Sequence, residues 1–325
     1  MTPVAVLGTG NLARAFAAQF ALLTAVGIAA ACGGSSSSPG PTVPTPIQRE
    51  RIDVRYANSS NAQRLDLYLP ATGEGPFPLV VWIHGGAFSG GSKTLAASSS
   101  ARQLTSKGFA IASLEYRLSG EALFPAGVLD LKAAIRHLRA NAATYRIAPE
   151  KIGAWGSSAG GHLAAFLGVT GGVAEFEDAT LGNAGQSSRV QAVVDWFGPA
   201  DMLQMEPDAV AQGCPKFGGI GHDDARSPEG LWLGGKPSSI PAVAMKASPV
   251  TWVSADDPPF IIQHGGQDCT VPTNQGRRMR DALLPVLGAS RVSWSEFPTD
   301  GHGGPSFGSA ENLDAIAAFF NRWLR

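Results

Sequence analysis

The chain has 325 residues, of which 16% are charged, and its formal net charge at pH 7 is −1. A charge so small and balanced gives no electrostatic basis for binding a phosphate backbone, so we expect no nucleic-acid partner. About 280 residues follow the first 45, which is an ordinary length for a one-domain α/β enzyme.

The first 32 residues are typical of an export signal. Arg14 precedes an apolar stretch, residues 15–31, which runs into Cys32 through three alanines. This ending resembles a bacterial lipoprotein signal, in which cleavage leaves the cysteine as a lipid-bearing N-terminus. Plain cleavage after the alanines and a retained anchor are the alternatives. We therefore expect an exported protein that is periplasmic, attached to the outer membrane through lipidated Cys32, or secreted.

The same segment also carries Gly8-x-Gly10-x-x-Ala13, the spacing of a dinucleotide-binding loop. Such a loop needs a second strand and an acidic residue about 20 positions further on. No acidic residue occurs before Glu50, and the run that follows Cys32 is rich in Ser, Pro and Gly. We therefore expect no cofactor. The rest of the chain divides into a linker, residues 33–47, and one folded domain, residues 48–325.

Short apolar runs alternate with helix-like stretches along the domain at residues 48–325. Runs with β-branched residues predict buried strands, and the longer stretches between them predict helices. This alternation favours an α/β fold, a mostly parallel twisted sheet with helices on both faces. The predicted strands are 52–56, 64–69, 77–83, 110–116, 152–155, 190–194, 260–264 and 291–297, the first two forming an antiparallel edge, and the predicted helices are 95–107, 127–140, 162–169 and 313–324.

The third predicted strand runs directly into His84-Gly85-Gly86-Ala87-Phe88. Acyl transfer builds negative charge on a carbonyl oxygen, and backbone N–H groups must be aimed at that oxygen in advance. A pair of glycines lets the main chain turn its N–H groups inward without obstruction by side chains. We therefore assign Gly85 and Gly86 to an oxyanion hole, with a plain loop after a strand as the alternative.

A serine follows the fifth predicted strand within Gly156-Ser157-Ser158-Ala159-Gly160. The pattern Gly-x-Ser-x-Gly between a strand and a helix is typical of a sharp turn that exposes a nucleophilic serine. The glycines leave room for a strained backbone and for close packing. Ser158 is therefore the predicted nucleophile, and the N–H of Ala159 is the predicted second contribution to the oxyanion hole.

Two loops near the end of the chain supply an acid and a base. Asp268 comes just after a predicted strand, at the end where open α/β sheets build their sites, and His302 lies between glycines after the last strand. The chain order Ser158, Asp268, His302 is the one expected for an α/β-hydrolase triad. The serine would attack, the histidine would carry its proton, and the aspartate would hold the imidazole tautomer. Asp300 is the alternative acid, but it lies only two residues from His302, a poor position from which to orient that ring.

The residues 200–248 form a long stretch between the sixth and seventh predicted strands. Such insertions often cover the acyl pocket in this fold, so we expect a lid-like element there. Phe88 and Trp196 adjoin strand ends near the predicted site, and we assign them to substrate binding, with a core role as the alternative. His222, in Gly-His-Asp-Asp, is only a weak indication of a metal ligand, and no second cluster stands at ligand spacing. We expect no metal, and packing or hydrogen-bonding roles for His137, His162, His222 and His264.

Four motifs, spread over residues 50–325, together resemble the α/β-hydrolase serine esterases. The branch they resemble most contains the bifunctional feruloyl and acetyl-xylan esterases and the hormone-sensitive-lipase-like carboxylesterases, although the latter usually have a third glycine where Ala87 stands. The resemblance implies hydrolysis of short-chain or aryl esters, including acetyl or feruloyl esters of plant polysaccharide, through an acyl-enzyme. The motifs are His84-Gly85-Gly86-Ala87-Phe88, Gly156 to Ala164, Asp268-x-x-Val271-Pro272-x-x-Gln275 and Gly301-His302-Gly303, with Asp195 to Asp201 as a further similarity.

Two other functions remain open. Serine peptidases of the prolyl-oligopeptidase type share the fold and a similar Asp-x-x-Val-Pro-x-x-Gln run. They usually carry a large N-terminal propeller, and we expect none here, since only about 50 residues precede the domain. A noncatalytic surface-binding module on the same scaffold typically lacks the serine or the histidine, and both are present here.

Apart from Cys32, the chain has two cysteines, Cys214 and Cys269. An even pair in an exported chain predicts a disulfide bond. Because Cys269 directly follows Asp268, that bond would tie the acid loop to the segment after Trp196. Two unpaired, buried thiols are the alternative.

Overall fold

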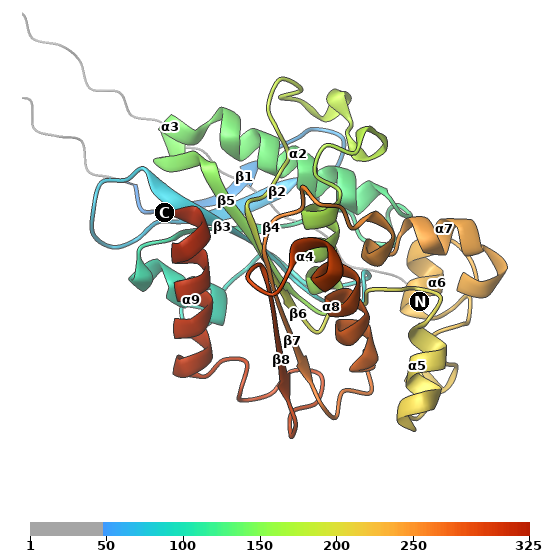
Figure 1. The fold of residues 1–325 in the computed structure, drawn as a ribbon. Helices are drawn as coiled ribbons and strands as arrows, with labels where there is room; N and C mark the ends of the chain where they lie inside the picture. Colours follow the sequence, from blue (N-terminus) through green and yellow to red (C-terminus); the bar gives the residue numbers. More distant parts are fainter. Residues whose placement is uncertain (1–47) are drawn as a thin grey trace, which may run out of the picture. The chain divides into compact units, whose positions relative to one another are not determined.

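One sheet of eight strands runs through the part of the chain that the structure, a computed structural model, describes: residues 48–325 (Figure 1). The predicted export signal, Cys32 and the predicted linker lie outside the described residues. The strand order is β1-β2-β4-β3-β5-β6-β7-β8. The strands are β1 (Glu50–Arg55), β2 (Arg64–Tyr68), β3 (Phe77–Ile83), β4 (Ala110–Leu114), β5 (Ile147–Ser157), β6 (Ala192–Trp196), β7 (Phe260–Gly265) and β8 (Val292–Phe297).

The sheet is mostly parallel, as predicted. Only β1 with β2 and β2 with β4 pair antiparallel, and every other neighbouring pair from β4 to β8 is parallel. Parallel strands need cover on both faces, and all five residues of β4 are buried. Because the strands from β3 to β8 run in one direction, the loops that follow their carboxyl ends lie along one edge of the sheet.

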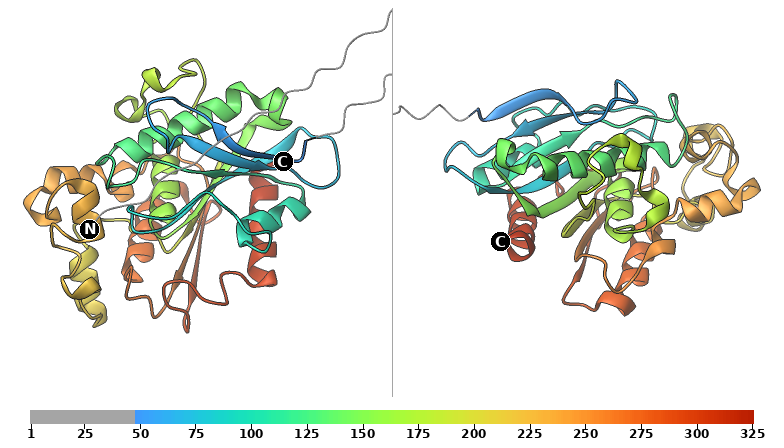
Figure 2. Two further views of the ribbon diagram at one scale, coloured as in Figure 1. Left: turned by 180° about the vertical axis from the view of Figure 1, so that it is seen from behind. Right: turned by 90° about the horizontal axis from the view of Figure 1, so that it is seen from above.

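Helices cover both faces of the sheet, so the fold is that of the α/β-hydrolases. Figures 1 and 2 show α9 (Ala310–Leu324) on one side of the strands and α4 (Ala159–Val169) with α8 (Asn274–Leu287) on the other. Successive residues of β3 belong to two hydrophobic core clusters, one on each face of the sheet. Val81 packs in the cluster that includes α2 (Ala126–Ala140) and α4, and Val80 packs in the cluster that includes α9. The short helical elements that complete the layers are α1 (Ser100–Gln103), η1 (Leu104–Lys107), α3 (Ala142–Tyr145), η2 (Ala174–Phe176) and η3 (Ala179–Leu181).

One predicted helix was wrong at its start, and one long helix was not predicted. The helix expected over residues 95–107 begins only at Ser100 and becomes a 3-10 turn from Leu104. The segment before it contains Ala-Ala-Ser-Ser, and serine hydroxyls favour caps and turns over helix interiors. The long helix α8 was missed, because its sequence is polar at the start and contains Pro285.

The predicted insertion joins β6 to β7 and is largely helical. Figure 2 shows its helices grouped together at one end of the sheet, in yellow and orange. No helix within residues 48–325 has the length and apolar character needed to cross a membrane. The elements of the insertion are α5 (Met205–Gln212), η4 (Phe217–Gly219), α6 (Pro228–Leu233), η5 (Pro237–Ser239), α7 (Pro241–Lys246) and η6 (Pro249–Trp252).

Candidate active site

Three side chains from three loops meet at the carboxyl ends of the parallel strands. Ser158 follows β5, Asp268 follows β7 and His302 follows β8. The His302 Nε2 atom lies 2.8 Å from Ser158 Oγ, and its Nδ1 atom lies 2.8 Å from Asp268 Oδ2. Both are hydrogen-bond distances, so hydroxyl, imidazole and carboxylate form one continuous chain. The alternative acid, Asp300, faces elsewhere, since its Oδ2 accepts a hydrogen bond from the backbone N–H of Ser306 at 3.0 Å.

The serine sits on a strained turn between β5 and α4. Its backbone has φ 58° and ψ −126°, a combination that L-residues rarely adopt and that is often found at functional sites. A Cβ atom on Gly156 would lie 2.1 Å from the carbonyl oxygen of Gly160, and one on Gly160 would lie 2.0 Å from that of Ile83. The two glycines therefore allow the turn to pack tightly against β3, and this presents the hydroxyl at the sheet edge.

Asp268 is fully buried and well supplied with hydrogen-bond donors. Its Oδ1 atom accepts from the backbone N–H groups of Thr270 at 2.9 Å and Val271 at 3.0 Å, while Oδ2 faces His302 and lies 3.4 Å from His264 Nε2. Burial alone raises the pKa of this carboxyl, but the hydrogen bonds of His264 and His302 outweigh burial and lower the pKa to about 2. The group is therefore ionised at neutral pH and can stabilise a protonated imidazole.

The loop after β3 packs directly against the serine. A Cβ atom on Gly85 would lie 2.7 Å from the carbonyl oxygen of Ser157. Gly86 has φ +116°, and the next two residues, Ala87 and Phe88, have φ 55° and 59°. Three successive positive φ values turn the chain sharply, and this strain marks a backbone held in place by its surroundings. The sequence analysis assigned a role to the two glycines but none to Ala87, although the glycine that some related esterases usually have at this position is typical of a positive φ.

Side chains from neighbouring strands fix this loop. The His84 ring stacks on Tyr116 and lies 3.2 Å from a carboxylate oxygen of Glu115, while the Tyr116 hydroxyl donates to the His84 carbonyl at 2.9 Å. These contacts hold the start of the loop to the end of β4. The start of the loop that carries the Gly85 and Gly86 amides is thereby fixed, and a backbone fixed in advance is one requirement for stabilising an oxyanion.

A cavity of about 30 Å³ opens beside Ser158. Phe88, which we assigned to substrate binding, lines it. Trp196 does not: its indole is buried in the core, where Nε1 donates to Gln263 Oε1 at 2.6 Å and the ring packs edge-on against Trp82 and Trp155. The sequence analysis also did not predict that His222, Pro228 and Glu229 of the insertion line this cavity. The lining residues are Ala87, Phe88, Ser158, Ala159, Pro199, His222, Pro228, Glu229, Thr270 and Val271.

A disulfide bond joins Cys214 and Cys269, with their Cα atoms 5.3 Å apart. Gln212, at the end of α5, adds two hydrogen bonds nearby: its Nε2 donates to the Asp268 carbonyl at 2.7 Å, and its Oε1 accepts from the Thr273 N–H at 2.9 Å. The insertion is thus attached to the loop that carries the buried carboxylate.

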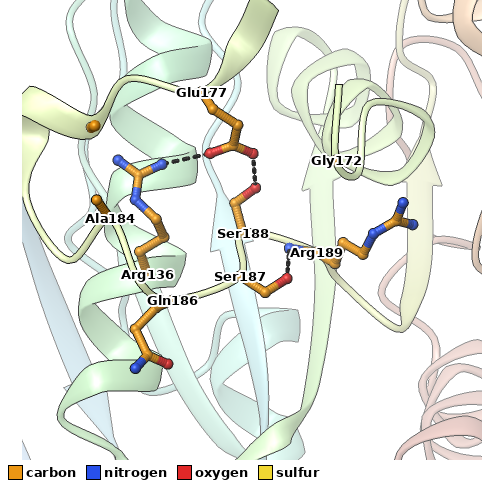
Figure 3. A pocket seen from close by; sticks show the side chains of 9 residues that line it. Arg136, Gly172, Glu177, Ala184, Gln186, Ser187, Ser188 and Arg189 are labelled. Carbon is orange, nitrogen blue, oxygen red and sulfur yellow. Dashed lines mark hydrogen bonds and ion pairs between the residues drawn. The ribbon is translucent and has the colours of Figure 1, made fainter. Parts of the chain in front are cut away.

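A larger cavity, of about 290 Å³, lies away from these residues and is lined from α2 and the segment 172–189 (Figure 3). Figure 3 shows that Arg136 and Ser188 both donate hydrogen bonds to the carboxylate of Glu177, so the main polar side chains of this cavity are paired with each other. No histidine is among the residues that line it. Within residues 48–325, no cluster of three or more His, Cys, Asp or Glu side chains is arranged to hold a metal ion.

Known proteins with this fold include esterases. A solved truncated form of a carbohydrate esterase from gut microbiota is 33% identical, with a TM-score of 0.76, and the match covers 85% of this chain and 96% of that one. A bifunctional GH43-CE protein of Bacteroides eggerthii is 35% identical, with a TM-score of 0.73, and the match covers 84% of this chain and 38% of that one.

Sequence relatives point the same way. Esterase LipC of Mycobacterium tuberculosis is 30% identical over 250 residues, which are 76% of this chain and 59% of LipC. The chain spans about six tenths of the length of such curated relatives. The sequence pattern of the BD-FAE family matches residues 65–283, about two thirds of the chain, and includes the serine turn and the buried carboxylate. The protein therefore belongs to the BD-FAE family.

Proposed function

We propose that this protein is a serine carboxylic ester hydrolase that removes small acyl groups through an acyl-enzyme. The observation that carries the proposal is the hydrogen-bonded chain from Ser158 through His302 to Asp268, with 2.8 Å at each step. In this assignment the serine is the nucleophile, the histidine is the general base and then the general acid, and the aspartate orients the imidazole.

Each step of the reaction has a group in position. As Ser158 Oγ attacks the ester carbonyl, its proton passes to His302 Nε2, and the ionised Asp268 stabilises the resulting imidazolium. The N–H of Ala159 and the N–H groups of the loop after β3, at Gly85 to Ala87, receive the negative oxygen. His302 then gives its proton to the leaving alcohol. A water molecule, deprotonated by the same imidazole, attacks the acyl-enzyme and releases the carboxylic acid.

The size of the cavity beside Ser158 favours a small acyl group. Its volume of about 30 Å³ is two to three times the roughly 10–15 Å³ that a cavity needs to hold one water molecule, which suits an acyl group with one or two non-hydrogen atoms beyond the carbonyl. A feruloyl group is far larger, so of the two acyl groups implied by the sequence we propose acetyl. The similarity to a carbohydrate esterase supports an acetylated saccharide as the natural alcohol.

The test replaces the nucleophile and uses its neighbour as the control. We expect Ser158→Ala to lower kcat/KM for p-nitrophenyl acetate by about 10⁴-fold or more and to abolish labelling by a fluorophosphonate, because the acyl-enzyme cannot form. Ser157→Ala should keep both. Retained burst kinetics in Ser158→Ala would refute the assignment. A panel of acetyl, butyryl and feruloyl esters, with an amide matched to the acetyl ester, tests the acyl group and separates the esterase from a peptidase.

We also propose that the protein is exported and that Cys32 carries a lipid. The support is the sequence alone, since this part of the chain lies outside the described residues. In the source organism, the mass of the mature protein should correspond to a chain that begins at Cys32 with added acyl chains. A mature protein that still begins at Met1 and stays in the cytoplasm would contradict this proposal.

A further inference from the structure

A buried glutamate of the insertion lines the cavity beside the nucleophile. Glu229 is only 3% exposed and lies in the first turn of α6. Ser227 fixes this turn, because its Oγ accepts from the Gly230 N–H at 3.0 Å and donates to the His222 carbonyl at 2.7 Å. Further along α6, Trp232 stacks on Phe88 with ring centroids 4.1 Å apart. The carboxylate is thus held at a defined position against the loop after β3.

The two oxygens of this carboxylate differ in their surroundings. His222 Nδ1 lies 3.2 Å from Oε1. The other oxygen, Oε2, is buried, and no hydrogen-bond donor within residues 48–325 is in reach of it. Leaving a buried carboxylate oxygen without a donor costs free energy, so such a group in a binding cavity indicates a ligand that supplies the donor.

The lining of the cavity shows which part of an ester lies near Glu229. The residues that line the cavity include Ser158, together with Ala87 and Ala159 from the two segments proposed to stabilise the oxyanion. His302 is not among these lining residues. The leaving alcohol must lie beside His302 Nε2, because that atom gives it a proton. The cavity therefore receives the other substituent of the carbonyl carbon, which is the acyl chain.

We propose that Glu229 selects acyl groups that carry a hydroxyl on the α-carbon, of which the smallest is glycolyl. This inference rests on the proposed ester hydrolysis and names a preferred acyl class for it. In a glycolyl ester the CH₂ group adjoins the reacting carbonyl, and this group and its hydroxyl together fit a cavity of about 30 Å³. The hydroxyl then donates to Glu229 Oε2. A methyl group at the same place leaves that oxygen buried without a donor.

The experiment compares two esters of one alcohol, ethyl glycolate and ethyl propionate, which differ only in a terminal hydroxyl or methyl. Acid release at constant pH gives kcat/KM for each, and the ratio is divided by the ratio of their rates with hydroxide alone. For the wild type we expect a corrected preference for glycolate of about tenfold or more, the usual worth of a hydrogen bond to a charged group. Glu229→Met should raise kcat/KM for propionate, lower it for glycolate, and bring the ratio to about one or below.

The control is Glu150→Met, an exposed glutamate on β5 whose replacement should keep the wild-type ratio. A wild-type ratio near one overturns the inference even where Glu229→Met fails to fold. So does an unchanged ratio in a folded Glu229→Met. Ser158→Ala should hydrolyse neither ester, whether or not Glu229 determines the preference between them. If the wild type hydrolyses neither these esters nor p-nitrophenyl acetate, the proposed function itself fails, and the inference falls with it.

Discussion

The disulfide between Cys214 and Cys269 allows a quantitative test of how the insertion is held. The two cysteines are 55 residues apart in the sequence. Cys214 lies close after Gln212, and Cys269 directly follows Asp268. In the chain-entropy model, a cross-link that closes a loop of this length removes conformational freedom from the unfolded chain worth about 4 kcal/mol at 25 °C. That is a large fraction of the 5–15 kcal/mol that is typical for a folded domain.

We therefore expect reduction, or the double substitution Cys214→Ser with Cys269→Ser, to lower the free energy of unfolding by about 4 kcal/mol. Activity at 25 °C should fall much less, because both hydrogen bonds of Gln212 persist without the disulfide and still position the acid loop. Urea unfolding of oxidised, reduced and double-serine protein measures the stabilities, and p-nitrophenyl acetate measures the activity.

The double-serine protein is its own control, since added reductant should not change its unfolding midpoint. The reasoning is wrong if oxidised and reduced wild type unfold at the same urea concentration. It is equally wrong if both thiols of the native, non-reduced protein react freely with an alkylating reagent.

Three further predictions concern buried groups. Burial raises the pKa of Asp195 to about 6 although its carboxylate accepts from the Gly198 N–H, so the ionised group destabilises the fold at alkaline pH. Asp195→Asn should add roughly 1–3 kcal/mol to the free energy of unfolding at pH 8 and almost nothing below about pH 3, where the carboxyl is protonated in both the folded and the unfolded state. An equal effect at both pH values would contradict this. The pKa of Asp268 is lowered to about 2, so its effect on stability has the opposite pH dependence. The ionised carboxylate contributes roughly 2 kcal/mol to the free energy of unfolding, a contribution that is complete above about pH 4 and is lost as pH falls toward 2. Asp268→Asn should flatten that acid limb of the stability profile, and an unchanged limb would count against the ionised carboxylate. Gly160→Ala should abolish soluble, active protein, because the new Cβ would lie 2.0 Å from the Ile83 carbonyl oxygen; a variant of normal melting temperature would show that the turn can relax.

The strands and the residues around the serine could be predicted because their signals are local. β3 is an unbroken apolar run whose predicted and observed bounds coincide, since a buried parallel strand has few polar positions. The turn at Ser158 was predictable from its glycines, because close approach of β3 excludes any larger residue. Asp268 and His302 were found from their places after strands, since the sheet gathers all such loops at one edge.

The rest of the site depends on contacts between distant segments. Glu229 lies 71 positions after Ser158 in a stretch that reads as an ordinary polar insertion. Only its burial against Phe88 and His222 makes it part of a cavity. Trp196 was assigned to the pocket because it ends a strand, but alternate strand residues face opposite sides of a sheet, and this one faces the α9 side.

The packing of Trp196 on Trp82 and Trp155 gives the protein a built-in optical probe. The three indoles lie on the adjacent strands β3, β5 and β6, edge-on to one another with ring centroids 4.8–6.2 Å apart. Rigid, asymmetric contact of this kind gives aromatic chromophores a strong near-ultraviolet circular dichroism, which vanishes once the rings rotate independently. The contribution of these three indoles therefore reports separation of the central strands, whereas movement of the insertion would alter the contribution of Trp232, which stacks on Phe88.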